Sequence, residues 1–305
     1  MHHIVYQTEG CEIDLKNLDK VFWPEKELLK ADLLDYYAKA GSFLIPYLKD
    51  RPFTLKRYPD GIYGKNFYQK ECPEYAPDWL QTVKVTHGKK AINYCLVNKT
   101  ADLLWVINQG CIELHTWLAT YINPAKPDFA VFDLDPAQGA SWKDVLAIAK
   151  LVEEILKELR LNGYPKTSGG SGLHIYIPIQ PKYDYQIIQT FIKKLAELVV
   201  GVFPEKATME RSIEKRHGKV YIDYLQNGAG RTMASVYSVR PVPEASVSMP
   251  VTWGEINEAM ILPETFTMNN ALAEISSRDA FFSNCLKNKQ DLASVLKILS
   301  IIKHF

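Results

Sequence analysis

The chain has 305 residues, of which 47% are hydrophobic and 23% charged, the composition of an ordinary globular protein with room for one large or two modest domains. No apolar run reaches the ~18 residues that a membrane helix needs, and the N-terminus lacks the basic start and apolar core of a signal peptide, so we expect a cytosolic protein. The formal net charge of +1 argues against a protein that coats duplex DNA, although local basic clusters can still bind nucleic acid.

The cysteines are scattered singly, and none forms a C-x-x-C pair: Cys11, Cys72, Cys95, Cys111 and Cys285. An odd number of isolated cysteines argues against a zinc ribbon or a disulfide framework. We therefore expect reduced cysteines that are mostly buried.

The first half of the chain begins with a capped entry into a helix. Apolar residues recur at helical spacing over Lys30–Leu48, and Pro46 is expected to end or kink this helix. Residues 51–125 have the pattern of strands and loops, with a β-like stretch at Ala91–Val97. A helix is also predicted at about Ile112–Thr120.

The second half alternates between strands and helices. The predicted order is a strand at Phe129–Asp135, a helix at Ser141–Leu161 with Ser141 as N-cap, a strand at Leu173–Ile179, a helix at Tyr185–Val202 and a strand at Val220–Leu225. This alternation predicts an α/β layer with helices packed on one face of a sheet. From Trp253 onward the sequence has a helical pattern.

Asp133 and Asp135 end the apolar strand at Phe129–Asp135. Side chains two apart on a strand project from the same face, so the two carboxylates repel each other unless a cation lies between them. Mg²⁺ and Mn²⁺ prefer oxygen ligands of this kind. Taken alone, D-x-D is also typical of a strand that ends in a polar turn, and Asp135-Pro136 has good turn chemistry.

Asp223 strengthens the metal hypothesis. It is the one carboxylate in the apolar segment Lys219–Leu225, where burying it without a partner is costly. A neighbouring strand that brought Asp223 beside Asp133 and Asp135 would complete a three-carboxylate, two-metal site. The alternative is a salt bridge from Asp223 to a nearby lysine or arginine.

The glycine-rich segment Thr167–Pro178 combines small residues with His174 at the start of a strand. Small residues let a backbone approach phosphate closely, and a histidine can donate a hydrogen bond to a triphosphate oxygen. The segment lacks the G-K-[ST] ending of a Walker A motif. A plain turn with a structural histidine is the alternative.

Further candidates carry weaker signals. His115 lies in a short Glu-Leu-His run, Arg231 and Arg240 can neutralise a triphosphate, and Phe67 and Tyr68 can stack on bases. Arginines are also common on solvated surfaces, however, and aromatic side chains commonly pack in a core.

Taken together, these motifs resemble the polymerase domains of the bacterial and archaeal ligase D system, which belong to the archaeo-eukaryotic primase superfamily. The matching runs appear in family order over roughly residues 10–255: Asn17–Pro24, Arg51-Pro52, Phe67–Lys70, Glu113–His115, Phe132–Pro136, Ser168–His174, Asp223–Asn227 and Tyr237–Arg240. The resemblance implies a single α/β (α+β) primase-polymerase domain with central, mostly antiparallel sheets flanked by helices. It further implies an N-terminal module at about 1–125, an RRM-like catalytic module at 126–250, a helical segment at 251–305, and an active site in the cleft between the first two.

The resemblance also implies roles for individual residues. The metal ligands for two Mn²⁺ or Mg²⁺ ions would be Asp133, Asp135 and Asp223. The nucleotide would be contacted by Ser168, Gly169, Ser171, His174, Arg231 and Arg240, with His115 near its sugar. The 5′-phosphate of a DNA break would be held by Asn17, Lys20 and Lys30. The template or DNA would be contacted by Arg57, Phe67, Tyr68, Lys70, His87, Lys89, Arg216 and Lys219, with Thr86–Lys90 as the hairpin that bridges DNA ends.

One departure from the family concerns the phosphate loop. Several relatives have a lysine between the loop glycines where this chain has Ser171, so one cation for the triphosphate is missing or supplied elsewhere, for example by Arg231. Relatives are often fused to a ligase and a phosphoesterase, whereas this sequence ends at Phe305. We therefore expect a stand-alone, nucleoid-associated polymerase that meets its ligase and Ku as separate proteins.

The predicted reaction is two-metal attack of a primer 3′-hydroxyl on the α-phosphate of an incoming nucleotide. The resemblance implies Mn²⁺ as the favoured metal and ribonucleotides as the favoured substrates. The predicted DNA substrate carries a 5′-phosphorylated gap or overhang. Two other functions stay open on sequence grounds: a metal-dependent phosphohydrolase, and a non-catalytic module that binds DNA ends.

Overall fold

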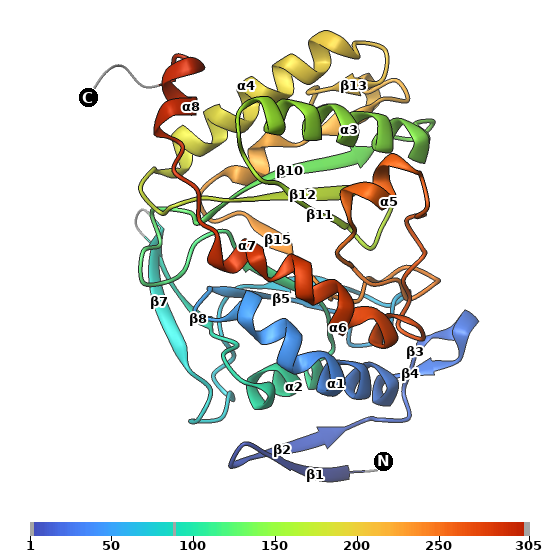
Figure 1. The fold of residues 1–305 in the computed structure, drawn as a ribbon. Helices are drawn as coiled ribbons and strands as arrows, with labels where there is room; N and C mark the ends of the chain where they lie inside the picture. Colours follow the sequence, from blue (N-terminus) through green and yellow to red (C-terminus); the bar gives the residue numbers. More distant parts are fainter. Residues whose placement is uncertain (1–2, 88–89, 302–305) are drawn as a thin grey trace. The chain divides into compact units, whose positions relative to one another are not determined.

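The computed structural model describes residues 3–87 and 90–301, and the chain divides into two compact units (Figure 1). Unit 1 comprises Met1–Ile122, Thr232–Met249 and Phe266–Asp279, and unit 2 comprises Asn123–Arg231, Pro250–Thr265 and Ala280–Phe305. Each unit therefore combines segments that are far apart in the sequence. Over the described ranges, no helix has both the length and the apolar character required to cross a membrane.

Unit 1 contains an antiparallel sheet with helices α1 and α2. Its strands are β1 (His3–Thr8), β2 (Cys11–Lys16), β3 (Val21–Trp23), β4 (Leu28–Leu29), β5 (Phe53–Arg57), β6 (Phe67–Gln69), β7 (Thr82–His87), β8 (Lys90–Cys95), β9 (Cys111–Trp117) and β15 (Thr232–Ala234). Its helices are η1 (Pro24–Lys26), α1 (Lys30–Leu48), α2 (Thr100–Asn108) and the part of α6 (Ala271–Phe282) up to Asp279. The sheet runs in the order β15-β9-β5-β8-β7, with β6 paired to β5. The pairs β1–β2 and β3–β4 form separate hairpins.

The helix predicted over Lys30–Leu48 is confirmed as α1. Its buried face includes Leu33, Tyr37, Ala40 and Leu44, which recur at helical spacing. Pro46 lies in the last turn, and the helix ends two residues later, in agreement with the expectation that this proline ends the helix. The β-like stretch predicted at Ala91–Val97 is confirmed as strand β8, which begins one residue earlier and ends at Cys95.

The helix predicted at about Ile112–Thr120 is wrong, because Cys111–Trp117 forms strand β9. Every residue of β9 is buried between β5 and β15, although apolar and polar residues alternate over Ile112–His115 as they do on a strand. This alternation spans too few residues to separate a strand from a helix by periodicity alone. The neighbouring helix is α2, which was not predicted from the sequence.

Unit 2 is a mixed sheet with helices on one face. Its strands are β10 (Phe129–Pro136), β11 (Tyr164–Thr167), β12 (Leu173–Pro178), β13 (Ala207–Thr208) and β14 (Val220–Ile222). Its helices are α3 (Trp142–Glu158), α4 (Tyr185–Val202), η2 (Ile213–Lys215), η3 (Tyr224–Asn227), α5 (Trp253–Asn257), α7 (Asn284–Lys287) and α8 (Ala293–Ile298). The sheet order is β11-β12-β10-β14-β13, antiparallel except for the β13–β14 pair.

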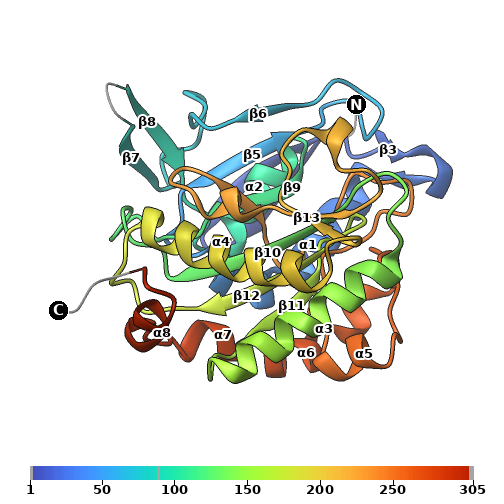
Figure 2. The same ribbon diagram turned by 90° about the horizontal axis from the view of Figure 1, so that it is seen from above.

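The predicted strand–helix alternation of unit 2 is confirmed, and Figures 1 and 2 show α3 and α4 side by side on one face of the sheet. Ser141 caps α3 as predicted: its hydroxyl accepts a hydrogen bond from the backbone N–H of Asp144 at 3.2 Å. The predicted strand at Val220–Leu225 is too long, because β14 ends at Ile222 and η3 follows. The tail is helical as expected, in α5 to α8.

Candidate functional site

Two adjacent strands of unit 2 bring the predicted carboxylates together. β10 and β14 pair with Leu134 opposite Ile222 and Asp135 opposite Tyr221. One position further along, the backbone N–H of Asp223 donates to the carbonyl oxygen of Asp133 at 2.9 Å. Since opposite and i, i+2 positions of paired strands share a face, the three aspartates lie at one end of the sheet. Asp223 itself lies just after the strand and not within it.

His174 faces Asp133 across the neighbouring strand pair. The two residues are opposite in the β10–β12 register, and Nε2 of His174 lies 3.2 Å from Oδ1 of Asp133. On the other side of the ring, Nζ of Lys166 lies 2.9 Å from Nδ1. An ammonium group can only donate, so Nδ1 accepts and Nε2 carries the proton toward Asp133. Sequence reasoning missed Lys166, because nothing in the sequence distinguishes this lysine in the short strand β11 from other lysines.

Asp223 begins the helical turn η3. Its Oδ1 accepts hydrogen bonds from the backbone N–H of Leu225 at 3.0 Å and from the hydroxyl of Tyr221 at 3.1 Å. Burial, followed by the charge of Asp223, raises the pKa of Tyr221 far above its usual range, so the hydroxyl stays a donor. The orientation of the Asp223 carboxylate is therefore set by neighbouring residues at the end of its own strand.

The donor chemistry of this cluster suits a hard divalent cation, because all three groups are carboxylates. In the present side-chain conformations, however, no group of three or more His, Cys, Asp or Glu residues converges to hold an ion anywhere in 3–87 or 90–301. Asp133 and Asp223 currently contact His174 and Tyr221 instead. Binding an ion would require these side chains to exchange protein partners for metal, and the predicted metal triad stays a prediction.

The predicted phosphate loop is a tight turn tied by Ser168. The Ser168 hydroxyl accepts hydrogen bonds from the N–H groups of Gly170 at 3.1 Å and Gly172 at 3.0 Å. A Cβ added to Gly172 would lie 2.3 Å from the carbonyl oxygen of Leu134, so this glycine is required for close approach to β10. Two of the N–H groups expected to cradle phosphate are therefore engaged within the loop, while Ser171 is exposed.

A cavity of about 200 Å³ beside Asp223 gathers three arginines of unit 2: Arg211, Arg216 and Arg231. The guanidinium of Arg216 stacks 3.8 Å from the ring centroid of Tyr221. The predicted nucleotide residue Arg231 and the predicted DNA residue Arg216 thus line one cavity, which sequence reasoning did not foresee. Arg211 was not assigned from sequence. Lys219 donates instead to the carbonyl oxygen of Pro204 at 2.8 Å.

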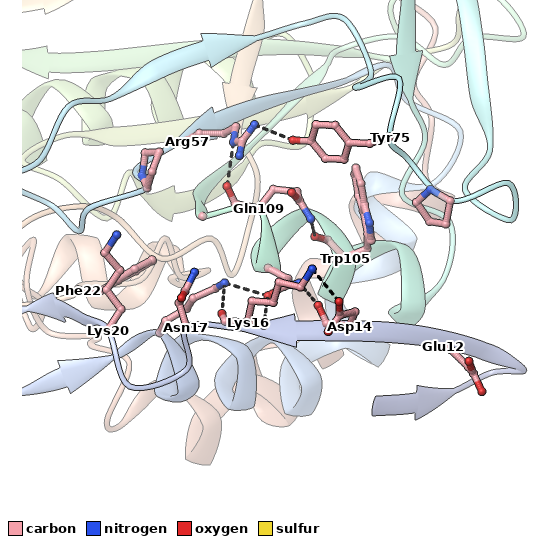
Figure 3. Close-up of a pocket in the computed structure, with 15 residues that line it drawn as sticks. Glu12, Asp14, Lys16, Asn17, Lys20, Phe22, Arg57, Tyr75, Trp105 and Gln109 are labelled. Carbon is pink, nitrogen blue, oxygen red and sulfur yellow. Dashed lines mark hydrogen bonds and ion pairs between the residues drawn. The ribbon is translucent and has the colours of Figure 1, made fainter. Parts of the chain in front are cut away.

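Unit 1 contains a larger cavity, of about 550 Å³, lined by the three residues predicted to hold a 5′-phosphate. Figure 3 shows Asn17 and Lys20 on one wall, and Arg57 and Tyr75 across from them. Lys20 forms an ion pair with Asp60. The structure therefore brings Asn17, Lys20 and Lys30 together with Arg57 around one cavity.

Lys30 is buried at the start of α1. Its ammonium donates to the carbonyl oxygen of Lys16 at 2.6 Å and to Oδ1 of Asn108 at 2.8 Å. Both acceptors are neutral, and burial, followed by the charges of Lys20 and Arg57, lowers the pKa of Lys30 to about 8. A cation in such a place is stabilised by an anion, which gives the cavity a physical preference for phosphate.

The predicted DNA-contact residues of unit 1 gather around β5 and β6. Phe67 and Tyr68 are exposed, the Arg57 guanidinium lies 5.5 Å from the Phe67 ring centroid, and Nζ of Lys56 lies 4.1 Å from that of Tyr68. Lys70 is exposed just after β6. Lys89, with part of the Thr86–Lys90 turn, lies outside the described residues, as does the side chain of His87.

His115 and Arg240 belong to unit 1 and share a partner that was not assigned from the sequence. Glu113 lies 3.2 Å from Nε2 of His115 and 3.1 Å from Nη2 of Arg240. The signal for this residue was present in the Glu-Leu-His run, because residues two apart on a strand share a face.

Comparison with known proteins shows the family to which the chain belongs. The family model described as LigD, primase-polymerase domain, matches residues 29–282. The bifunctional non-homologous end joining protein LigD of Bacillus subtilis is 31% identical over 281 residues, which are 92% of this chain and 45% of that protein. The multifunctional non-homologous end joining protein LigD of Mycolicibacterium smegmatis is 32% identical over 246 residues, 80% of this chain and 32% of that protein.

Among solved structures, the polymerase domain from Mycobacterium tuberculosis ligase D in complex with DNA aligns with a TM-score of 0.84 and 27% identity. The alignment covers 91% of this chain and 99% of that one. The chain thus spans less than half the length of the two curated relatives but nearly all of the solved polymerase domain. Its mixed α/β fold with antiparallel sheets is that of the solved domain.

Proposed function

The chain belongs to the LigD primase-polymerase domain family, and from this premise we propose that it is a template-directed nucleotidyltransferase that extends primers and fills gaps at broken DNA ends. The observation that carries the proposal is the placement of Asp133, Asp135 and Asp223 at one end of two paired strands. The proposed substrates are nucleoside triphosphates and DNA with a 5′-phosphorylated gap or overhang. The proposed partners are a DNA ligase and Ku, at the nucleoid.

We assign the three aspartates to holding Mn²⁺ or Mg²⁺. Two divalent ions bound there supply the Lewis acidity that activates a 3′-hydroxyl and neutralises a pyrophosphate leaving group. The chain's own residues supply charge and orientation. Arg211, Arg216 and Arg231 line the cavity beside Asp223 and offer guanidinium donors to the oxygens of a triphosphate.

We assign the cationic cavity of unit 1 to the 5′-phosphate of a DNA break. Lys20 and Lys30 supply positive charge, and Asn17 supplies an amide donor. The exposed rings of Phe67 and Tyr68 offer a surface on which template bases stack. We assign His115 to the sugar of the nucleotide, where a polar contact to the 2′-hydroxyl favours ribonucleotides.

Primer extension on a gapped duplex with a 5′-phosphate tests the proposal, with Mn²⁺ or Mg²⁺ and with either NTPs or dNTPs. Asp133→Asn and Asp135→Asn are expected to abolish extension while DNA binding survives. Asp184→Asn is the matched control, since Asp184 caps α4 in the same unit and asparagine caps equally well. Full extension by either active-site variant contradicts the metal assignment, and NTP hydrolysis without extension indicates a phosphohydrolase.

A further inference from the structure

The cationic cavity of unit 1 is larger than the phosphate assigned to it. Its volume is about 550 Å³, which lies within the range of roughly 300–1,000 Å³ of pockets that take a whole small molecule. The proposed phosphate ligands Asn17, Lys20 and Lys30 form only part of its lining, and Tyr75 and Trp105 also line it. A terminal phosphate bound by the first three residues therefore leaves room for the nucleotide that carries it.

Charge changes sign along strand β2, which forms one wall of the cavity. Glu12, Asp14 and Lys16 are alternate residues on the exposed face of this strand, and all three line the cavity. A strand rises about 3.3 Å per residue, so Glu12 lies roughly 13 Å from Lys16 along β2. Figure 3 shows Asn17 and Lys20 toward one end of the cavity and the two acidic residues toward the other. Phosphate therefore binds best at the lysine end, and the acidic end favours a ligand part without negative charge.

An exposed tyrosine lies at the acidic end of the cavity. Tyr75 is 63% exposed, and its ring centroid lies 6.3 Å from that of Trp105. Its hydroxyl accepts a hydrogen bond from Nη1 of Arg57 at 3.1 Å, which anchors the ring at the cavity. Trp105 precedes Asn108 by three residues on α2, so both line the cavity from the same face of the helix. Figure 3 shows Tyr75 and Trp105 toward the end where Asp14 lies.

The chemistry of this end suits a nucleobase. A base is uncharged and stacks on an exposed aromatic ring whatever its identity, because every base has a π-face. The carboxylates of Glu12 and Asp14 can accept hydrogen bonds from the amino groups of adenine or cytosine. One cavity thus offers cations to a phosphate at one end and a ring with acceptors to a base at the other.

We propose that Tyr75, with Trp105 beside it, forms a nucleobase subsite for the unpaired first nucleotide of a DNA strand whose 5′-phosphate is held by Asn17, Lys20 and Lys30. The inference deepens the proposed function and rests on its assignment of the 5′-phosphate to this cavity. A base inside a duplex is paired and stacked and is not free to enter. The cavity therefore favours a 5′-phosphorylated overhang or frayed end over an end that is fully paired.

Binding of 5′-phosphorylated duplexes with one unpaired first nucleotide tests the subsite, in the absence of metal and of nucleoside triphosphate. The wild type is expected to bind an end with adenine about fivefold or more tighter than the same end with an abasic first nucleotide, as the stacking of one base allows. Tyr75→Ala is expected to lose this difference, and Tyr75→Phe to keep it. Tyr63→Ala is the matched control, since Tyr63 is 64% exposed in the same unit and hydrogen-bonds to Glu25 away from the cavity.

Photocrosslinking locates the base directly in the wild-type protein. With 5-iodouracil as the first base of the same duplex, the crosslink is expected on Tyr75 or Trp105. A crosslink on Phe67 or Tyr68 would place the base on the surface assigned to the template and would overturn the inference.

Equal wild-type affinity for the adenine and abasic ends also overturns the inference, as does a Tyr75→Ala variant that keeps the difference or a Tyr63→Ala variant that loses it. The same ends with a 5′-hydroxyl separate the inference from the function on which it rests. If the wild type has no preference for the 5′-phosphate, the phosphate assignment and the subsite fail together. If both preferences are present but no primer is extended, the polymerase proposal fails and the subsite stands.

Discussion

The protonated form of Lys30, which is the form that binds phosphate, is predicted to destabilise the fold. Burial, followed by the charges of Lys20 and Arg57, lowers its pKa from 10.5 to about 8. The folded protein therefore holds this proton less tightly than the unfolded chain does, so the charged ammonium costs stability below pH 8. The cost disappears as the pH rises from about 8 to about 10.5, because the unfolded chain then loses the same proton.

The magnitude follows from the difference between the two pKa values, 10.5 minus 8, or about 2.5 units. At 1.36 kcal/mol per unit this corresponds to roughly 3 kcal/mol, and solvent in the open cavity screens it to about 2 kcal/mol. Lys30→Met keeps the apolar stem and removes the charge. The free energy of unfolding of the wild type, minus that of Lys30→Met, is therefore expected to rise by about 2 kcal/mol between pH 7 and pH 10.5.

Urea unfolding across this pH range measures the difference, with Lys39→Met as the control. Lys39 is on the same helix but its side chain is exposed, so solvent screens its charge and Lys39→Met should change the free energy of unfolding little. Removing the Lys30 ammonium should stabilise the fold but weaken phosphate binding. Lys30→Met is expected to lose about tenfold or more of the preference for a 5′-phosphorylated over a 5′-hydroxyl gap at pH 7. The wild-type preference should weaken above pH 8. A flat stability difference, or an unchanged phosphate preference, refutes the reasoning.

Three further substitutions test the packing that supports the sites. Asn227→Ala removes hydrogen bonds of 2.8 Å to both backbone groups of Val131, and should lower the free energy of unfolding by about 2–3 kcal/mol in urea titrations. Gly172→Ala places a methyl group against the Leu134 carbonyl, so extension activity and melting temperature should both fall. Ser141→Ala removes the α3 cap and should cost about 1 kcal/mol with activity intact, as calorimetry and primer extension can show.

Local chemistry predicted much of the fold. The helix over Lys30–Leu48 and the strand of Asp133 are set by periodicity and by their own end signals, and both are confirmed. The strand Cys111–Trp117 was predicted as a helix because the alternation of apolar and polar residues in its Ile-Glu-Leu-His run is too short to identify a strand. Its identity depends on β5 and β15, which come from distant parts of the sequence.

In the candidate sites, too, proximity within one strand can be predicted from the sequence, whereas contacts between strands cannot. The proximity of Asp133 and Asp135 follows from strand geometry alone. Contacts across strands do not: Lys166 meets His174 because β11 pairs with β12, and Arg240 meets Glu113 through a segment more than a hundred residues away. Charged residues brought together by pairing therefore cannot be recognised from their spacing in the sequence, whereas pairs within one strand can.

The two histidines differ in what they offer to a ligand. Each points Nε2 at a carboxylate, His174 at Asp133 and His115 at Glu113. In His174 the second nitrogen accepts from Lys166, so both ring nitrogens are engaged within the protein. Its Nε2–H can donate to a phosphate oxygen only when Asp133 turns away. In His115 the second nitrogen has no hydrogen-bond partner among the described residues but is buried, while Tyr58 and Arg240 hold Glu113 against Nε2. A ligand contact at Nδ1 of His115 would therefore require the residues that cover it to move, whereas a contact at His174 is coupled to the conformation of Asp133.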